Sequence, residues 1–320
     1  MHYDVFNGDA DGILSLVQLR LLAPREAVLV TGVKRDISLL QRVSAAAGDT
    51  VQVLDISLEQ NLLPLQRLLQ QDVTVDYIDH HRAGEIPQSP LLTTHIDLSA
   101  DTCTALIVDK LLDGQQRLWA IAAAFGDNML TAARRLAATL ALNDTDTAFL
   151  QQLGTLINYN AYGNKVAELH IDPATLFRQL VGYHSPWALR DDFSSPYYVL
   201  QAAYARDMQQ LSALMPAHND DVLLLYRLPD APWAKRISGV MGNQLANANP
   251  DKAIAIVTDN PDSTLMISLR APLNNRQGAG TLCSRFTSGG GRAAAGGINA
   301  LPVQQLAQFR ESVIAYYAHC

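Results

Sequence analysis

Cysteine is scarce in this chain, which has three cysteines among 320 residues. Cys103, Cys283 and Cys320 form no CxxC pair, so neither a disulfide framework nor a zinc knuckle is indicated. Long apolar runs are also missing, since no stretch approaches the roughly 20 uncharged residues that a membrane span needs. The opening residues, MHYDVFNGDADG, lack a charged-then-apolar signal pattern, and we therefore expect a cytoplasmic protein without a membrane partner.

Positive charge is scarce as well. Lys and Arg number 24 against 31 Asp and Glu, which gives a net charge of −7. The acidic excess lies in residues 1–218, whereas residues 219–320 carry a slight basic excess. This balance argues against the strongly basic surface of proteins that bind long duplex DNA. The acidic part suits cations and the basic part suits anions, although ordinary surface variation would give the same totals.

The first 80 residues alternate between β-forming and helical patterns. β-forming runs cover 2–8, 27–32, 50–57 and 73–79, and helical apolar spacing lies between them at 13–22, 36–47 and 60–71. Strand, helix, strand at about 25-residue spacing predicts a doubly wound, mostly parallel sheet with right-handed crossovers. Further helices are expected at 102–112 and 116–127 and onward to about residue 150.

The second half of the chain predicts a smaller α/β domain. One long helix is expected at 197–215, and short β-forming runs follow at 222–228, 253–259 and 265–271. A Gly-rich stretch at 287–298 precedes a terminal helix. We therefore expect an α/β protein with domains at 1–190 and 219–320, joined by a helical linker at 191–218.

Acidic and imidazole side chains come directly after the predicted strands, at the edge where an open parallel sheet binds its ligands. Carboxylates crowded together repel each other, and at about 4 Å each pair costs several kcal/mol at an effective dielectric near 20. Either some are protonated or cations lie among them, and aspartates with an imidazole favour Mn²⁺ or Mg²⁺. Each motif alone fits an ordinary turn, but their common position does not. The residues are Asp9, Asp11, Asp55, Asp79, His80 and His81 at the strand ends, and Asp127, which closes a further apolar run and would reach the same place.

The order NGDADG, VLDIS, YIDHHRAGE and FGDN resembles the four motifs of the DHH phosphoesterase superfamily. The stretch LMISLRAPLNNRQGAGTLCSRFTSGGGRAAAGGI is similar to the DHHA1 substrate-binding domain, which typically carries an S-x-R strand and a GGGH-x-x-AAG loop. The resemblance covers most of the chain except roughly 150–215. It implies a DHH domain at 1–190, a DHHA1-like domain at 219–320, and the activity of the Mn²⁺- or Mg²⁺-dependent phosphohydrolases of this superfamily, including RecJ-like exonucleases and oligoribonucleases.

Carried over position by position, the resemblance implies a centre of two Mn²⁺ or Mg²⁺ ions. Asp9 would hold one ion and Asp11 the other, and Asp55 would bridge them. His80 and Asp127 would complete the second site. The ions would lower the pKa of a bridging water and offset the charge of the phosphoryl group.

Other residues are implied to hold the imidazoles or the substrate. Asp79 would orient the histidine pair without touching a metal, and His81 would contact the substrate phosphate. Guanidinium groups can hold phosphate oxygens bidentately, and glycine amides allow a phosphate to come close. The residues implied on this basis are Arg270, Arg292, Gly289, Gly290 and Gly291.

Three departures from the family pattern concern these sites. Val5 stands where oligoribonuclease-like members have His, and Asn7 stands where RecJ-like members have Asp. Asn7 offers only a neutral carbonyl oxygen, so we expect it to contact substrate and the first metal site to be weak or to fill only with substrate present. Arg292 stands where the GGG loop usually has His, and RAAAGG aligns with that loop in two ways. We therefore expect the substrate-binding domain to accept a different chemical group from the one that its relatives accept.

Several other residues have two interpretations each. Lys34 and Arg35 follow the second strand and either face the crevice, where they would meet a second phosphate, or begin a solvated helix. Asn128 is a phosphate donor or an ordinary turn residue. Tyr159 and Tyr162 stack on a base or pack in the core or at a domain hinge.

We therefore predict a metal-dependent phosphoesterase that hydrolyses phosphodiester or phosphomonoester bonds of short nucleotides. Its substrates would be oligoribonucleotides, linear or cyclic dinucleotides or a nucleoside bisphosphate. Two other functions stay open, a nucleotide-binding sensor with degenerate catalysis and a pyrophosphate or polyphosphate hydrolase. The sequence leaves the base preference and the oligomeric state open, and a homodimer is one option.

Overall fold

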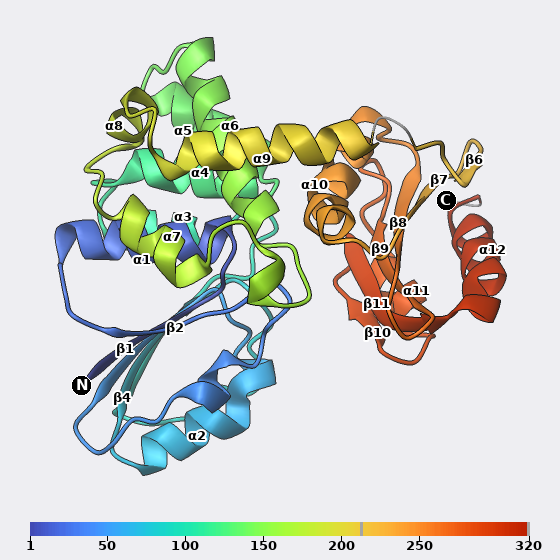
Figure 1. The fold of residues 1–320 in the computed structure, drawn as a ribbon. Helices are drawn as coiled ribbons and strands as arrows, with labels where there is room; N and C mark the ends of the chain where they lie inside the picture. The colour runs from blue at the N-terminus through green and yellow to red at the C-terminus, as the bar shows by residue number, and fades with distance from the viewer. Residues whose placement is uncertain (212–213, 319–320) are drawn as a thin grey trace. The chain divides into compact units, whose positions relative to one another are not determined.

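The computed structural model describes residues 1–211 and 214–318. The chain divides into two compact units, Met1–Ala203 and Tyr204–Cys320, and each is described by itself (Figure 1). The division lies within α9 (Pro196–Leu211), inside the range where a linker is expected. The helix expected at 197–215 is observed as far as Leu211, and positions 212–213 lie outside the described residues. Among the described helices, none combines the length and the apolar character that a membrane crossing requires.

The first unit is built on a five-stranded sheet in which all neighbouring strands run parallel. Its strand order, β2-β1-β3-β4-β5, reverses between β1 and β3, and parallel sheets of this kind bind ligands beyond the carboxyl ends of the strands at that point. The predicted doubly wound parallel sheet is thus confirmed. The strands are β1 (His2–Phe6), β2 (Val28–Val30), β3 (Thr50–Leu54), β4 (Thr74–Asp79) and β5 (Leu92–Ile96).

Helices cover both faces of this sheet, with α2 on one face and α1, α3 and α7 on the other (Figure 1). Under α2, the apolar side chains of Val53 and Val75 from the strands pack with Leu65 and Leu68 from the helix. Burial on both faces explains why the strands read as nearly continuous apolar runs. The helices are α1 (Ala10–Leu22), α2 (Leu62–Gln70), α3 (Thr104–Leu111), α4 (Arg117–Gly126), α5 (Leu130–Thr139), α6 (Asp144–Asn160), α7 (Pro173–Leu180) and α8 (Pro186–Asp191), with short 3₁₀ turns η1 (Leu39–Arg42), η2 (Glu59–Asn61) and η3 (Val166–Glu168).

The helix expected at 36–47 was wrong, because only η1 is helical there. The side chain of Asn61 donates to the Ile37 carbonyl at 2.7 Å and accepts from the Leu40 N–H at 3.4 Å. These bonds occupy backbone groups that a continuous helix would pair internally, so the segment is held as a loop. Strand β5 was not predicted, since it is a polar edge strand whose residues LTTHI show no apolar alternation.

The second unit is a smaller α/β domain with a mixed six-stranded sheet in the order β10-β11-β9-β8-β7-β6. Only β7 and β8 are parallel neighbours among the described pairs. Helix α10 covers one face of the sheet and α12 the other (Figure 1), and α10 was not predicted. The elements are β6 (His218–Asn219), β7 (Leu223–Leu228), α10 (Pro232–Ala248), β8 (Ala253–Asp259), β9 (Thr264–Arg270), α11 (Ala279–Cys283), β10 (Gly289–Gly291), β11 (Ala295–Pro302), η4 (Val303–Gln305) and α12 (Leu306–Tyr317).

The Gly-rich stretch forms a β-hairpin where the family pattern suggested a loop. Gly289 pairs with Ile298 and Gly291 with Gly296 in the antiparallel β10–β11 ladder. A Cβ atom on Gly289 would lie 1.9 Å from the Cys283 carbonyl oxygen, so only glycine lets β10 pack this closely against α11. Gly289 is therefore needed for the packing of β10 against α11, apart from any role in binding substrate.

Candidate metal centre

The carboxyl ends of β1, β3 and β4 and the end of α4 bring acidic side chains around one imidazole. The Nε2 atom of His80 lies 3.8 Å from Asp11 Oδ2, 3.5 Å from Asp55 Oδ1 and 4.0 Å from Asp127 Oδ2. Asp11 and Asp55 are almost completely buried, whereas the side chain of Asp127 is 14% exposed. Residues far apart in the sequence thus form one cluster with a solvent-facing side at Asp127.

Asp9 caps the N-terminus of α1 and pairs with a lysine. Its Oδ1 atom accepts from the N–H groups of Asp11 at 3.0 Å and Gly12 at 3.1 Å, and its Oδ2 atom accepts from Lys34 Nζ. Burial raises the pKa of Asp9, but the charge of Lys34 and these hydrogen bonds outweigh burial, so the pKa lies below its ordinary value. Asp9 is therefore held as a carboxylate by the chain itself.

Asp11 binds the N-terminus of α3. It accepts from the N–H of Thr104 at 2.8 Å and the N–H of Ala105 at 2.7 Å, which have no partner within the helix. Burial and the nearby charges of Asp127 and Asp9 still raise the pKa of Asp11. This carboxylate therefore combines a structural role with a position in the cluster.

The hydrogen bonds of His80 decide which of its nitrogens can bind a ligand. Its Nδ1 atom lies 3.2 Å from the Thr102 carbonyl oxygen, which can only accept, so we assign the proton to Nδ1. The lone pair is then on Nε2, which points at the three carboxylates. A backbone partner of this kind is the usual way in which a metal-binding imidazole is oriented.

His81 is oriented by Asp79. The His81 Nδ1 atom lies 2.7 Å from Asp79 Oδ1, and the two histidine rings are 4.4 Å apart. The sequence led us to expect that Asp79 would orient both histidines, but His80 is instead oriented by its hydrogen bond to the Thr102 carbonyl. Asp79 Oδ2 is buried and has no hydrogen-bond partner among the described residues.

Asp55 has a left-handed backbone with φ of 59°, which is uncommon for a residue other than glycine. Its N–H donates to the Ile78 carbonyl at 3.1 Å, and Thr104 Oγ1 donates to its carboxylate at 3.4 Å. Burial and then the charges of the neighbouring aspartates raise the pKa of Asp55 well above its ordinary value. The carboxylate is thus placed where a negative charge is unfavourable unless a cation is present.

Lys34 lies inside the acidic cluster. Its ammonium donates to Asp9 and to Asn158 Oδ1 at 3.0 Å, lies 3.6 Å from Asp127 Oδ1, and is 5.6 Å from the centre of the Tyr162 ring. Burial lowers the pKa of Lys34, but the carboxylates, Asp9 above all, raise it well above its ordinary value. Of its two interpretations from the sequence, the geometry excludes the solvated helix start.

Asn7 bonds to the chain itself. Its Oδ1 atom accepts from the Asp9 N–H at 3.2 Å, and its Nδ2 atom donates to the Lys34 carbonyl at 3.3 Å. The side chain is nearly buried. The amide that was expected to contact substrate instead connects the Asp9 turn to the loop that carries Lys34.

The donor atoms of the cluster fit a divalent cation. Two groups of three have ligand atoms within 4.8 Å of one another, Asp11 with His80 and Asp127, and Asp55 with His80 and His81. Carboxylate oxygens with imidazole nitrogens suit Mn²⁺ or Mg²⁺. The nearby Cys103 is unsuited to zinc binding, because burial and the charge of Asp11 raise the pKa of its thiol well above the ordinary value.

The arginines and glycines implied to bind substrate lie in the second unit. Arg270 at the end of β9 donates through Nε to Asn243 Oδ1 and through Nη1 to Ser268 Oγ, both at 3.0 Å. These bonds fix the plane of its guanidinium group. Arg292 is exposed at the turn of the β10–β11 hairpin.

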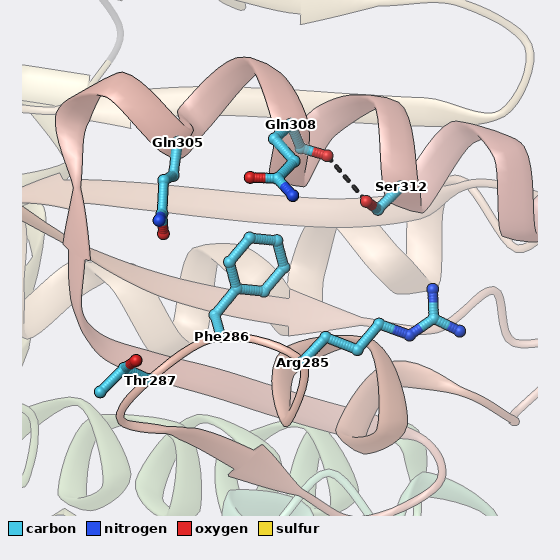
Figure 2. A pocket seen from close by; sticks show the side chains of 6 residues that line it. All are labelled: Arg285, Phe286, Thr287, Gln305, Gln308 and Ser312. Atoms are coloured by element: carbon cyan, nitrogen blue, oxygen red, sulfur yellow. Dashed lines mark hydrogen bonds between the residues drawn. The ribbon is translucent and has the colours of Figure 1, made fainter.

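A pocket of about 310 Å³ lies elsewhere on the second unit, between the segment after α11 and helix α12 (Figure 2). The ring of Phe286 faces this helix in Figure 2, and the rest of the lining is polar. None of the residues expected to bind substrate lines it. The lining residues are Arg285, Phe286, Thr287, Gln305, Gln308 and Ser312.

No protein-family model and no curated protein matches the chain, whereas solved structures do. Exonuclease RecJ bound to manganese is 17% identical, with 100% of this chain and 90% of RecJ covered at a TM-score of 0.57. The pGpG-specific phosphodiesterase PggH from Vibrio cholerae is 15% identical, with 99% of each chain covered at 0.58. An exopolyphosphatase-related protein from Bacteroides fragilis is 15% identical, with 99% of this chain and 92% of that chain covered at 0.51. The chain therefore shares the overall fold of these three structures.

Sequence reasoning missed two residues that contact the cluster. Thr104 donates through its N–H to Asp11 and through Oγ1 to Asp55, and it lies inside the helix expected at 102–112. Asn158 accepts from Lys34, and it lies near the end of α6, at a position that no sequence motif singled out. The role of Lys34 itself depends on this contact across the fold.

Proposed function

We propose that the chain is a metal-dependent phosphoesterase that uses Mn²⁺ or Mg²⁺ to hydrolyse short nucleotide substrates. The observation that carries the proposal is the convergence of Asp11, His80 and Asp127 beside Asp55 at the switch point of a parallel sheet. The fold supports it, because RecJ and PggH share this fold and are named an exonuclease and a phosphodiesterase.

In this proposal Asp11, His80 and Asp127 hold an ion, and the carboxylate of Asp55 offers a further donor 3.5 Å from His80 Nε2. A bound divalent ion lowers the pKa of water and offsets the charge of a phosphoryl group. The chain contributes the orientation of the donors. The Thr102 carbonyl fixes the proton of His80 on Nδ1, and the α3 N-terminus fixes the carboxylate of Asp11.

His81 is the proposed contact for the substrate phosphate. Asp79 accepts the Nδ1 proton of His81 at 2.7 Å and so stabilises the ring in one orientation. In its doubly protonated form His81 would also donate through Nε2 to a phosphate oxygen. The His81 side chain is 28% exposed, which leaves it accessible.

The proposed substrate is short because the chain lacks the basic surface that long nucleic acids require. Its net charge is −7. Arg270 is the proposed second phosphate contact, since its guanidinium plane is already fixed by Asn243 and Ser268. Gly290 offers a further approach, because open space surrounds the position of a Cβ there. Arg292 at the hairpin turn remains a candidate of the same kind.

The test is hydrolysis by the full chain with Mn²⁺. Linear and cyclic dinucleotides, a nucleoside bisphosphate, a short oligoribonucleotide and pyrophosphate would be incubated with the protein, and products separated by chromatography. We expect cleavage of at least one nucleotide and a loss of roughly 100-fold or more in rate for Asp55→Asn. Asp97→Asn is the control, since Asp97 lies after β5 and its side chain bonds to Ser99 and Lys110, outside the cluster. Full activity in Asp55→Asn, or no cleavage of any nucleotide by the wild type, would contradict the proposal.

A nucleotide-binding sensor is the second candidate, and the ammonium of Lys34 at Asp9 favours it. A lysine at this carboxylate reduces the number of donors left for metal ions. Calorimetry separates the two functions. Tight nucleotide binding with no product after long incubation with Mn²⁺ would favour the sensor.

A further inference from the structure

Lys34 is positioned by the backbone of its own loop. Its N–H donates to the Ala161 carbonyl at 3.0 Å, and its carbonyl accepts from the Asn7 side chain at 3.3 Å. A Cβ atom on Gly8 would lie 1.9 Å from the Gly32 carbonyl oxygen, so glycine lets the Lys34 loop lie directly against the Asp9 turn. The place of the lysine is thus built into the fold.

The ammonium of Lys34 occupies a complete site for a cation. An ammonium has three N–H donors and no acceptor, and here Asp9 and Asn158 accept from it while Asp127 lies at 3.6 Å. Asn158 is buried and is the partner that α6 supplies. Tyr162 adds the face of its ring at 5.6 Å.

These contacts use both oxygens of Asp9. Oδ1 accepts from two backbone N–H groups, and Oδ2 accepts from Lys34. Asp9 also belongs to neither group of three donors that lie close enough to hold a metal ion among the described residues. The residues beside Asp9 add no replacement, since Val5 is apolar and the Asn7 amide bonds to the chain.

We propose that the ammonium of Lys34 takes the place of one of the two divalent ions expected from the sequence, so that the centre holds a single ion at Asp11, His80 and Asp127. The inference rests on the proposed function, because it takes this cluster to be the metal centre. A second divalent ion at Asp9 would lie beside a fixed positive charge and would compete with it for Oδ2. Lys34 offsets the charge of Asp9 without any bound ion. This explains why Val5 and Asn7 can stand where family members have a His or an Asp.

The test counts metal ions and does not depend on hydrolysis. The full chain would be stripped with a chelator, titrated with MnCl₂ and desalted, and Mn²⁺ per chain measured by elemental analysis, with electron paramagnetic resonance as the second readout. We expect one ion per wild-type chain with the spectrum of an isolated Mn²⁺. Lys34→Met keeps the length of the side chain and removes its charge, and we expect it to gain a second ion with a spectrum broadened by coupling between the two.

Lys110→Met is the matched control, because Lys110 pairs with Asp97 on the surface and is 67% exposed. It should bind one ion, like the wild type. Two coupled ions in the wild type would overturn the inference and leave the proposed function standing, and a single ion in Lys34→Met would also overturn it. No bound ion in the wild type would overturn the proposed function as well. Should Lys34→Met not fold, Lys34→Gln and the wild-type count still decide the question.

Discussion

Two unfavourable features, a left-handed backbone and a crowded buried carboxylate, coincide at Asp55. A residue other than glycine at φ of 59° costs of the order of 1–3 kcal/mol. Its carboxylate is buried beside other carboxylates, which raises its pKa well above the ordinary value. The hydrogen bond from Thr104 is long at 3.4 Å and compensates little of this. Such strain is typical of functional sites, and here it faces the free nitrogen of His80.

The raised pKa of Asp55 predicts how the metal-free protein responds to pH. The folded state holds a proton that the unfolded state releases near the ordinary value of 3.8. The stabilising contribution is therefore complete below that value and is lost as the pH rises through the raised pKa. The pKa of Asp11 is also raised, so its contribution is lost in the same direction. Asp9 shifts the other way, so its contribution is present above 3.8 and lost only at lower pH.

We therefore expect the midpoint temperature of the first unit's unfolding transition in chelator to fall as the pH rises from about 4 toward the raised pKa of Asp55. Asp55→Asn removes the titrating group, so its midpoint should fall less over this range. At the upper end it should exceed the wild type by about 2–4 °C for each kcal/mol recovered. Asp97→Asn should keep the wild-type slope, because the pKa of Asp97 is lowered by its bonds to Ser99. A midpoint that stays level or rises in the wild type would contradict this account.

The sequence predicted the acidic members of the cluster and left Lys34 with two interpretations, either facing the crevice to meet a phosphate or beginning a solvated helix. Asp9, Asp11, Asp55 and the aspartate–histidine segment stand at strand ends, and strand ends of a parallel sheet meet at one edge. Lys34 stands after a strand too, but its role is set by Asn158, a partner 124 positions away in the chain. No local pattern reports such a contact.

At the scale of elements, the sequence predicted the helices and strands that have strong apolar periodicity. It failed where one side chain or one close approach decides the backbone. Asn61 prevents a helix at 36–47 by bonding to the Ile37 and Leu40 backbone. The glycines of β10 form a strand because the paired chains come close together, and glycine by itself favours no strand.

Two neighbouring glycines of the β10–β11 hairpin differ in their surroundings, since Gly289 is packed against backbone and Gly290 is open. A valine at Gly289 would place its Cβ 1.9 Å from the Cys283 carbonyl oxygen, whereas a Cβ at Gly290 would have nothing within 4 Å. We expect Gly289→Val to lower the free energy of unfolding by roughly 3 kcal/mol, since the displaced atom is backbone. Gly290→Val should change it by less than about 0.5 kcal/mol. Urea denaturation of both variants measures the difference, and equal losses would refute the packing argument.

At the scale of the whole molecule, each unit has its own core. In the first unit the sheet packs with α2 around Val53 and Leu65. In the second, α12 packs on one face of the sheet through Phe309 and α10 on the other through Ile237. A chain with separate cores commonly unfolds in more than one step, so a single midpoint does not describe it. The candidate metal ligands all belong to the first unit.

Mn²⁺ should therefore stabilise one unit and leave the other unchanged. Calorimetry of the full chain at neutral pH should show two transitions, because each unit buries its own apolar side chains. An ion bound only by the folded state adds about 2.7 kcal/mol at 100 times its Kd, which raises the first unit's midpoint by roughly 5–10 °C. Gly289→Val identifies which transition belongs to which unit, since it should lower only the midpoint of the second unit. His80→Ala should abolish the metal shift, because it removes the nitrogen that faces Asp11, Asp55 and Asp127. Mn²⁺ moving the transition that Gly289→Val lowers would place the ion in the second unit and contradict the assignment of the centre.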